Sequence, residues 1–453
     1  MPVMRDNHLM KRYPRRKLKE PDAFVQMIPV LFSQMSEIQS FHFDSSLPLS
    51  VFAPRYAQFS VVVLFGLGCF ILSVFALRDA TSRPVASTVH TSGRTISYSL
   101  RPNSTAWARC QSLIHGSTRP SDGGYRLQNS QSDGDIFDKY RDESCHQIRA
   151  FYPHPTPTRT ELDFPIAYGI LIYKGLPLFE RLLQALYMPQ NYYCIHIDKK
   201  TNSYFVDAAQ RMVACLPNVF IAKTRVNVKW GEISLVKAEL SCMTELQTFK
   251  WKYYINLVGQ DFPLYNNMEI VRVLKSLHGL NNIESIEMPA YNVHRVEFVR
   301  HGQKLLRKSP PPHGLIIRKG SVHGILTRKF TEFVLRDKVA RDLLKWLEDV
   351  FAADEIFFAT LQYDQATPGG IHGQQPECIA RVKRWRPGYC AGRYVRNICW
   401  IDIRDLTWVL SEGNNRKLFV NKIPFEFSSD LLKCMLESLL RRRYPMGTRG
   451  RPS

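Results

Sequence analysis

Two adjacent carboxylates, Asp354 and Glu355, are side chains of this sequence that could act as a general base. They precede the apolar run Ile356–Phe358, which predicts a loop–helix junction with the carboxylates at its edge. A carboxylate half-sheltered by such a cluster has a raised pKa, as a general base requires. The alternative is structural, because the helix dipole favours acidic side chains in the first turn of a helix.

Two cationic side chains could neutralise a phosphorylated leaving group. Arg396 lies in the alternating, strand-like stretch 394–399, and Lys422 ends the stretch 418–422. Transfer from a nucleotide sugar to a hydroxyl needs a base for the acceptor proton. It also needs positive charge for the departing diphosphate, from a divalent metal or from Arg and Lys directly. Each of the two cations also fits an ordinary surface charge.

Strands and helices that would position these residues alternate from Phe164 onward. Apolar runs predict strands at 166–172, 192–197, 219–222 and 253–258. Apolar residues recur at helical spacing in five stretches. These are 178–188, the stretch between Asp198 and about residue 214, 234–247, 330–351 and 428–441. This alternation predicts a mostly parallel α/β sheet, in which ligands bind beyond the carboxyl ends of strands. Asp198 and the segment 259–261 follow two of these strands.

Several motifs that mark other enzyme classes are absent from the sequence. It contains no Gly-x-Gly-x-x-Gly and no Gly-x-x-x-x-Gly-Lys-Ser/Thr, which argues against a dinucleotide dehydrogenase and a P-loop enzyme. It also contains no Gly-x-Ser-x-Gly, His-Glu-x-x-His or Cys-x-x-Cys. The sequence therefore offers no obvious zinc cage or esterase-type nucleophile.

The composition is strongly basic. Lysine and arginine total 61 against 40 aspartates and glutamates, which gives a formal net charge of +21 over 453 residues. The 45% hydrophobic content excludes a disordered tail protein and a collagen-like repeat. The positive balance fits an anionic small ligand, a polyanionic glycan or simply a solvated basic surface. A nucleic acid partner is not expected, because the luminal location that the sequence predicts contains little nucleic acid.

The N-terminal region predicts a single-pass membrane protein. Residues 59–77 contain no charge, lie between Arg55 and Arg78, and are long enough for a transmembrane signal-anchor helix. The basic N-terminal cluster favours a cytosolic tail at 1–58. Nine of the ten cysteines and the glycosylation sequon at Asn103 follow the span, which fits an oxidising lumen. We expect a luminal stem at 78–160, a catalytic domain at 161–440 and a basic tail at 441–453.

Strings of residues in a fixed order give the chain a resemblance to a known family. They include Phe164–Tyr168, Tyr187–Asn191, Tyr193–Asp198, Asn256–Pro263, Asp354–Glu355 and Phe419–Lys422. Over about residues 145–437 the chain resembles the core 2 and I-branching β-1,6-N-acetylglucosaminyltransferases, glycosyltransferase family 14. The resemblance implies a single Rossmann-like, mostly parallel sheet of the type A glycosyltransferase kind. It also implies a type II Golgi membrane enzyme that uses UDP-GlcNAc, inverts the anomeric centre and needs no metal or other cofactor.

The resemblance also assigns roles to individual residues. Glu355 is the implied catalytic base. The implied donor-binding residues are Leu171, Ile172, Asp198, Trp230, Arg396 and Lys422. The implied acceptor-binding residues are Glu284, Arg295 and Trp385. The implied disulfides join Cys110 to Cys434, Cys145 to Cys215, Cys194 to Cys242, and Cys390 to Cys399; Cys378 is left over.

The sequence departs from the family pattern chiefly on the acceptor side. Asn292 replaces an acceptor lysine, Tyr173-Lys174 replaces a histidine pair, and Ala352-Ala353 replaces Ser-Pro. Residues 362–390 are shortened and divergent. The donor machinery is therefore expected to be intact and the acceptor side altered.

These features predict a β-1,6-branching N-acetylglucosaminyltransferase acting on O-glycans of glycoproteins. Its partners would be a UDP-sugar, a glycan acceptor and a membrane, with a homodimer left open and no nucleic acid. Two alternatives remain. One is a UDP-xylose-using relative, which the string Trp230–Leu235 resembles slightly. The other is a catalytically inactive, membrane-tethered glycan-binding protein.

Overall fold

The computed structural model describes residues 87–91, 94–98, 103–114, 131–301, 304–364, 366–414, 416–426 and 429–444. All of them belong to one compact unit that spans residues 81–453. The expected cytosolic tail at 1–58 and the expected span at 59–77 lie outside the described residues. Among the residues that are described, no helix combines the length and the apolar character needed to cross a membrane.

A six-stranded sheet in the order β5-β4-β3-β6-β13-β8 forms the centre of the molecule. Its strands are β3 (Ile166–Ile172), β4 (Tyr192–Ile197), β5 (Val219–Ile221), β6 (Tyr253–Val258), β8 (Asn282–Ile283) and β13 (Gly324–Thr327). The four strands predicted from the sequence are parallel neighbours, with Ala167 opposite Tyr192 and Ile166 opposite Tyr253. Strand β13 runs antiparallel to both β6 and β8. The sheet is therefore mixed, but five of its six strands run in the same direction, which agrees with the predicted mostly parallel sheet.

Strand β3 lies in the middle of this sheet and is buried along its whole length. A continuous apolar run is typical of a strand covered on both faces. Gly169 in this strand has a specific steric role. A Cβ at this position would lie 1.9 Å from the Tyr254 hydroxyl on the neighbouring strand, so no larger residue fits.

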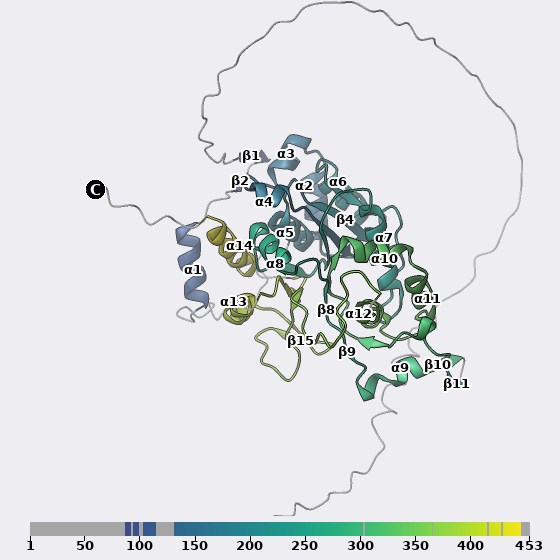
Figure 1. Cartoon of the computed structure of the whole chain (residues 1–453). Coiled ribbons are helices and arrows are strands. Elements are labelled where there is room, and N and C mark those ends of the chain that lie inside the picture. The colour runs from purple at the N-terminus through teal and green to yellow at the C-terminus, as the bar shows by residue number, and fades with distance from the viewer. Residues whose placement is uncertain are drawn as a thin grey trace, which may run out of the picture. The chain divides into compact units, whose positions relative to one another are not determined.

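Helices cover both faces of the sheet (Figure 1). Alternate residues of β3, such as Ile166 and Ile170, join a core with α5 (Leu176–Leu186), α6 (Ser203–Val213) and α8 (Asn267–Lys275). Ala167 faces the other core, with α7 (Ser234–Leu246), α10 (Arg328–Arg336), α11 (Lys338–Trp346) and α12 (Phe357–Tyr363). This division follows from the two-residue side-chain period of a strand.

The helical stretch predicted at 330–351 is divided into α10 and α11. Asp337 between them has an extended backbone, with φ −74° and ψ 146°. Its side chain accepts a hydrogen bond from the Val339 amide at 2.8 Å, so it caps α11. The aspartate thus ends one amphipathic helix and starts the next, which periodicity alone did not reveal. The helix predicted near 428–441 is confirmed as α14 (Ser429–Arg443).

A second, three-stranded sheet supports the C-terminal part of the chain. It has the order β14 (Arg381–Val382), β17 (Phe419–Asn421) and β7 (Asp261–Pro263). The buried Arg381 guanidinium on β14 lies 3.0 Å from the Asp261 carboxylate on β7. This ion pair joins the two outer strands of the three-stranded sheet. Because β7 directly follows β6, this sheet brings residues near 420 to the carboxyl end of the central strands.

Part of the segment predicted as a stem packs in the core of the folded domain. The sequence assigned 78–160 to a stem, but α2 (Asp133–Tyr140) and α3 (Cys145–Ala150) pack on the central domain. Ile136, Tyr140 and Tyr152 are almost completely buried in the core beside α5 and α6. A few apolar residues in a polar segment are a weak sequence signal, and their contact with distant helices decided the packing.

Three of the four expected disulfides are present. They join Cys110 to Cys434, Cys145 to Cys215, and Cys390 to Cys399. The fourth expectation is not met, because Cys194 on β4 and Cys242 on α7 are both free and buried. The Cys242 thiol donates a hydrogen bond to the Cys194 carbonyl oxygen at 3.3 Å. The thiol is thus directed toward the strand backbone, which lets both cysteines pack as small apolar residues.

Candidate active site

A cavity of about 370 Å³ lies at the carboxyl end of the parallel strands. We call it the strand-end cavity. The ends of β3 and β4, the turn after β6, and residues of the C-terminal part line it. All six residues predicted to bind the donor are among its lining residues, namely Leu171, Ile172, Asp198, Trp230, Arg396 and Lys422. The structure thus brings together side chains that are as much as 251 positions apart in the sequence, from Leu171 to Lys422.

Asp198 is fixed where it leaves β4. Its two carboxylate oxygens accept hydrogen bonds from the amide and the ammonium of Lys200, each at 2.9 Å. His196 in the same strand accepts a hydrogen bond from the Val226 amide at 2.9 Å. Burial lowers the pKa of His196 to about 4, so its ring is neutral at pH 7. The floor of the cavity is therefore preformed.

Arg396 is carried at the tip of a two-residue hairpin between β15 (Arg393–Val395) and β16 (Ile398–Trp400). Arg396 and Asn397 both have positive φ angles, 51° and 66°. That combination is what a type I′ turn requires, and arginine is an unusual residue there. The Arg396 guanidinium lies 4.7 Å from the centre of the Trp230 ring, at the cavity wall. A non-glycine residue with a strained backbone, such as Arg396, is often found at a functional site.

Lys422 reaches the strand-end cavity from the end of β17. Its side chain is half-buried, and its carbonyl oxygen accepts a hydrogen bond from the Ile401 amide at 3.0 Å. Burial lowers the pKa of Lys422, and repulsion from Arg396 and Lys174 adds to this effect. A like-charge cluster of this kind is stabilised when an anion enters.

Glu355 lies in the 3-10 turn Ala353–Glu355, before α12. Its Oε2 atom lies 3.1 Å from the guanidinium of Arg295 and 3.8 Å from the ammonium of Lys319. Asp354 and Glu355 both lie in the first turn of this short helix, so the alternative that the helix dipole favours acidic side chains there also fits the structure. Burial, followed by the neighbouring Glu355 charge, raises the pKa of Asp354 to about 6.

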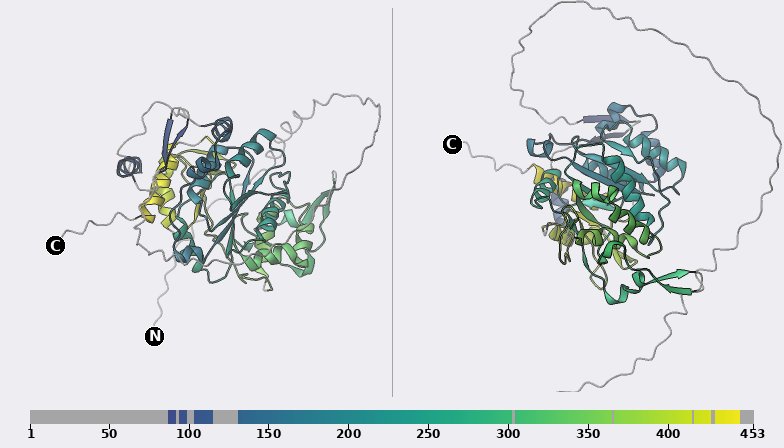
Figure 2. Two further views of the ribbon diagram at one scale, coloured as in Figure 1. Left: turned by 90° about the horizontal axis from the view of Figure 1, so that it is seen from above. Right: turned by 45° about the vertical axis from the view of Figure 1, so that its right-hand side comes forward.

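A chain of ring contacts links Glu355 with the strand-end cavity. Its partner Arg295 lies 5.3 Å from the centre of the Phe351 ring. Phe351 packs edge-on against Trp230 with ring centres 5.4 Å apart, and Trp230 lines the cavity. Gly231 permits this contact, because a Cβ there would lie 2.5 Å from the Phe351 ring. Arg295 itself lies on α9 (His294–Glu297), at the base of the projecting β10–β11 hairpin (Phe298–His301 and Lys304–Arg307; Figure 2).

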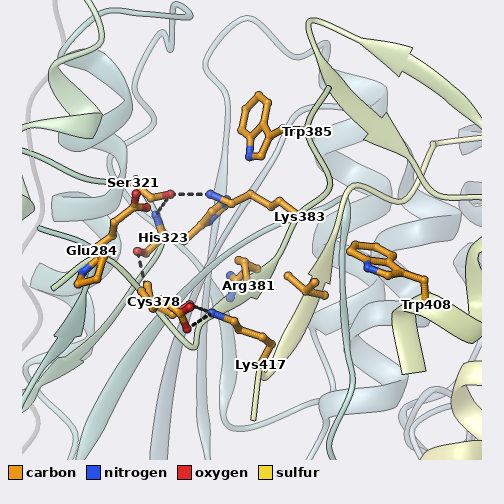
Figure 3. Close-up of a pocket in the computed structure, with 12 residues that line it drawn as sticks. Glu284, Ser321, His323, Cys378, Arg381, Lys383, Trp385, Trp408 and Lys417 are labelled. Carbon is orange, nitrogen blue, oxygen red and sulfur yellow. Dashed lines mark hydrogen bonds and ion pairs between the residues drawn. The ribbon is translucent and has the colours of Figure 1, made fainter. Parts of the chain in front are cut away.

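A second cavity, of about 260 Å³, is built mainly from loops (Figure 3). We call it the loop cavity. Two of the predicted acceptor residues, Glu284 and Trp385, line it, whereas Arg295 lies outside and contacts Glu355. The Lys383 ammonium donates a hydrogen bond to the Ser321 hydroxyl at 2.9 Å. The adjacent Gly320 amide donates to the Glu355 carbonyl oxygen at 2.7 Å, so one short loop connects this cavity with Glu355.

Sequence reasoning missed several residues of the two cavities. In the loop cavity these are Ser321, His323 and Lys383, and in the strand-end cavity Lys174. Lys383 stands two positions before Trp385, which places both on the same side of an extended segment. The two-residue spacing from Trp385 was the sequence signal that could have identified Lys383 as a residue of the loop cavity. Asn292, which stands where the family has an acceptor lysine, is buried and lines neither cavity.

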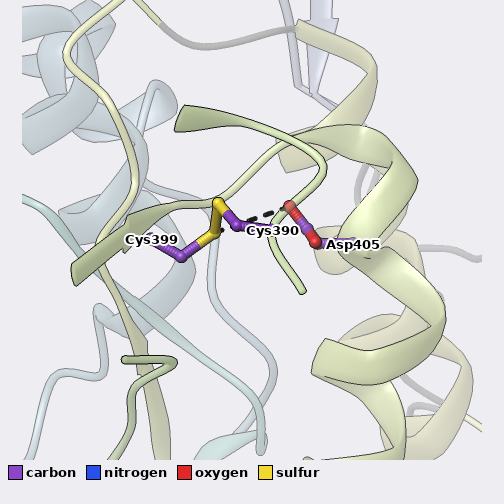
Figure 4. A group of neighbouring side chains, drawn as sticks. All are labelled: Cys390, Cys399 and Asp405. Carbon is purple, nitrogen blue, oxygen red and sulfur yellow. Dashed lines mark hydrogen bonds between the residues drawn. A yellow bond between two sulfur atoms is a disulfide. The ribbon is translucent and has the colours of Figure 1, made fainter. Parts of the chain in front are cut away.

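Within the described ranges, one group of side chains has the composition of a metal site, namely Cys390, Cys399 and Asp405 (Figure 4). The two cysteines form a disulfide, so neither sulfur can bind a metal as a thiolate. The Asp405 carboxylate accepts hydrogen bonds from the amides of Ala391 and Asp402, each at 3.0 Å. This group is therefore a structural brace for the hairpin that carries Arg396.

Residues 166–410 match the family model for the Core-2/I-branching enzyme domain. A human N-acetyllactosaminide β-1,6-N-acetylglucosaminyl-transferase is 36% identical over 339 residues, which cover 65% of this chain and 83% of that protein. A human β-1,3-galactosyl-O-glycosyl-glycoprotein β-1,6-N-acetylglucosaminyltransferase is 35% identical over 326 residues, which cover 66% of this chain and 73% of that protein. A solved mannosyltransferase from Pyrobaculum calidifontis aligns at 12% identity over 75% of this chain and 81% of its own. Its TM-score of 0.27 is too low to support an argument.

Proposed function

Because this chain belongs to the Core-2/I-branching enzyme family, a family of glycosyltransferases, we propose that it transfers GlcNAc from UDP-GlcNAc to a 6-hydroxyl of Gal or GalNAc in O-glycans. The sugar and the β-1,6 linkage are those in the names of its relatives. One observation carries the proposal. All six expected donor-binding residues line the strand-end cavity, and Glu355 is joined to that cavity through Arg295, Phe351 and Trp230.

Glu355 is the proposed general base. The acceptor 6-hydroxyl oxygen attacks the anomeric carbon of GlcNAc, while its proton passes to the Glu355 carboxylate. The bond between the anomeric carbon and the phosphate oxygen breaks, and UDP leaves with the bonding electron pair. In-line attack inverts the anomeric centre. The ion pairs with Arg295 and Lys319 hold the carboxylate in one position for this step.

Arg396 and Lys422 are the proposed partners of the departing diphosphate. They approach the strand-end cavity from different elements, and the Arg396 charge adds to the effect of burial in lowering the pKa of Lys422. Fixed positive charge beside the developing negative charge lowers the activation barrier without reorganisation at the moment of reaction. The proposal therefore includes transfer without a divalent metal.

The loop cavity is the proposed site of the acceptor glycan. Trp385 is 51% exposed and offers a flat ring on which the apolar face of a sugar could stack. Glu284 can accept hydrogen bonds from sugar hydroxyls, and Lys383 retains donor capacity beyond its bond to Ser321. The family has an acceptor-binding lysine at the position of Asn292, which is buried in this chain. We propose that Lys383, which belongs to a different segment and lines the loop cavity, supplies the positive charge instead.

The proposed setting is the Golgi membrane, with a cytosolic N-terminus and a luminal catalytic domain. The support is the uncharged stretch 59–77, the basic residues before it and the disulfides after it. Three disulfides are expected of an oxidising compartment.

The decisive experiment measures transfer by the full chain in EDTA. UDP-GlcNAc would be offered with arrays of O-linked and poly-N-acetyllactosamine acceptors, and the products analysed by mass and linkage. A new β-1,6-linked GlcNAc branch supports donor, linkage and metal independence together. Transfer from UDP-xylose alone would replace the proposed donor. UDP binding without transfer to any acceptor would contradict the proposed activity, and glycan binding without UDP affinity would favour a non-enzymatic role.

A further inference from the structure

Lys174 is a cation of the strand-end cavity that the expected donor set does not include. It lies two positions after the end of β3, next to Tyr173, and both residues line the cavity together with Arg396 and Lys422. Within the part of the chain that the structure describes, no carboxylate lies within ion-pair distance of its ammonium. The charge of Lys174 is therefore not neutralised by the protein itself.

Aromatic contacts hold the Lys174 ammonium at the cavity. It lies 4.4 Å from the centre of the Phe425 ring and 5.9 Å from that of Tyr173. Phe425 also packs against Gly175, where a Cβ would lie 2.3 Å from the ring and where φ is 79°. The turn that presents Lys174 is thus fixed by close packing, and cation–π attraction favours the observed position of the charge.

The charges that line the strand-end cavity are strongly unbalanced. Lys174, Lys200, Arg396 and Lys422 line it, against the single carboxylate of Asp198. Lys200 forms an ion pair with Asp198 at 2.9 Å, which leaves the other three cations without a carboxylate partner at that distance. Lys174 is also close enough to Lys422 to contribute to lowering its pKa. Three mutually repelling cations favour a ligand that carries several negative charges.

We propose that Lys174 is a third diphosphate-binding residue, and that it acts chiefly on the UDP leaving group. This inference rests on the proposed function. A UDP-sugar gains one negative charge on its diphosphate when the bond to the sugar breaks. A third cation therefore stabilises the products, and the transition state that resembles them, more than the bound donor. Lys174 stands where the family pattern has a histidine, so the lysine at this position is a departure of this chain from that pattern.

The test compares Lys174→Met with Lys199→Met in the full chain. Methionine keeps the alkyl chain over Phe425 and removes only the charge. Lys199 is an exposed lysine after β4 that does not line the cavity, so it serves as the matched control. Calorimetric titration with UDP, UMP and uridine separates the parts of the ligand. We expect Lys174→Met to weaken UDP binding about fivefold to tenfold, with little effect on uridine, and Lys199→Met to change neither.

The outcomes separate this inference from the proposed function. UDP affinity that drops in Arg396→Gln but not in Lys174→Met would overturn the role of Lys174 and leave the donor site in place. An equal loss of UDP and uridine affinity in Lys174→Met would also overturn it, because it would show a collapsed cavity. A wild-type chain that does not bind UDP would overturn both. Partial recovery of UDP affinity in Lys174→Arg supports a role of the charge itself.

Discussion

The strand-end cavity and the loop cavity are each connected to Glu355 through neighbouring residues, and they are built in different ways. The first is formed where the parallel strands β3 and β4 end, and its residues follow the element boundaries closely. The second is formed by the segments around Glu284, Ser321 and 376–385, which have little regular structure. A ligand held by strand ends is constrained by the whole sheet, whereas loops accept substitution at little cost to the fold. Among the departures from the family pattern, the divergent segment 362–390 reaches the second region, whereas Tyr173-Lys174 lies in the first.

The largest effect is expected at Glu355, which is connected to both cavities through its neighbours. Glu355→Gln keeps the size of the side chain but removes the base, so transfer should fall by roughly 100- to 10,000-fold. UDP affinity should stay within twofold, because Glu355 does not line the strand-end cavity. Initial transfer rates and calorimetry on the same preparation test this. Glu297→Gln, an exposed carboxylate on α9, is the control and should keep full activity. Normal turnover by Glu355→Gln would remove the assigned base.

The next largest effect is expected in the strand-end cavity. Arg396→Gln removes the proposed charge-assisted contact to the diphosphate and should weaken UDP binding roughly 10- to 100-fold. Arg393→Gln, three residues earlier on the same hairpin and outside the cavity, should leave UDP affinity unchanged. Equal losses in both variants, measured by calorimetry, would mean that the hairpin as a whole, rather than the Arg396 charge, supports the site.

A smaller effect is expected in the loop cavity. Trp385→Ala removes an exposed ring and should raise the KM for the acceptor about threefold to tenfold, with no change in UDP affinity. The comparison with Arg396→Gln should then show two separable binding sites. A Trp385→Ala variant that loses UDP affinity and leaves the acceptor KM unchanged would contradict the division into donor and acceptor cavities.

The smallest effect concerns pH. In the proposed mechanism the charged form of Lys422 binds the diphosphate, and its pKa lies below the ordinary lysine value because of burial and nearby cations. UDP affinity should therefore be full below this lowered pKa and fall as the pH rises through it, at a lower pH than an ordinary lysine would give. Lys422→Arg should move the decline to higher pH, since arginine stays charged. An identical pH profile in both proteins would exclude Lys422 as the titrating group.

The two regions also differed in how far the sequence predicted them. Strands β3, β4, β5 and β6 were recognised from apolar runs, since buried parallel strands have that simple pattern. Strands β8 and β13 were missed, because they have two and four residues and resemble loops. Lys383 was not recognised as a residue of the loop cavity, because local sequence patterns do not reveal its tertiary contact either. Its relation to Ser321 depends on a contact between segments 62 positions apart, for which local periodicity carries no signal.

The sequence by itself determined the alternation of strands and helices, the family, and the residue types available for a base and a diphosphate site. These follow from local patterns, because periodicity and motif order are properties of short segments. Only the tertiary structure decided that β13 makes the sheet mixed, that Cys194 and Cys242 remain free thiols, and that Lys174 joins Arg396 and Lys422. These depend on which distant segments come into contact, and that is set by the packing of the whole domain rather than by any one segment.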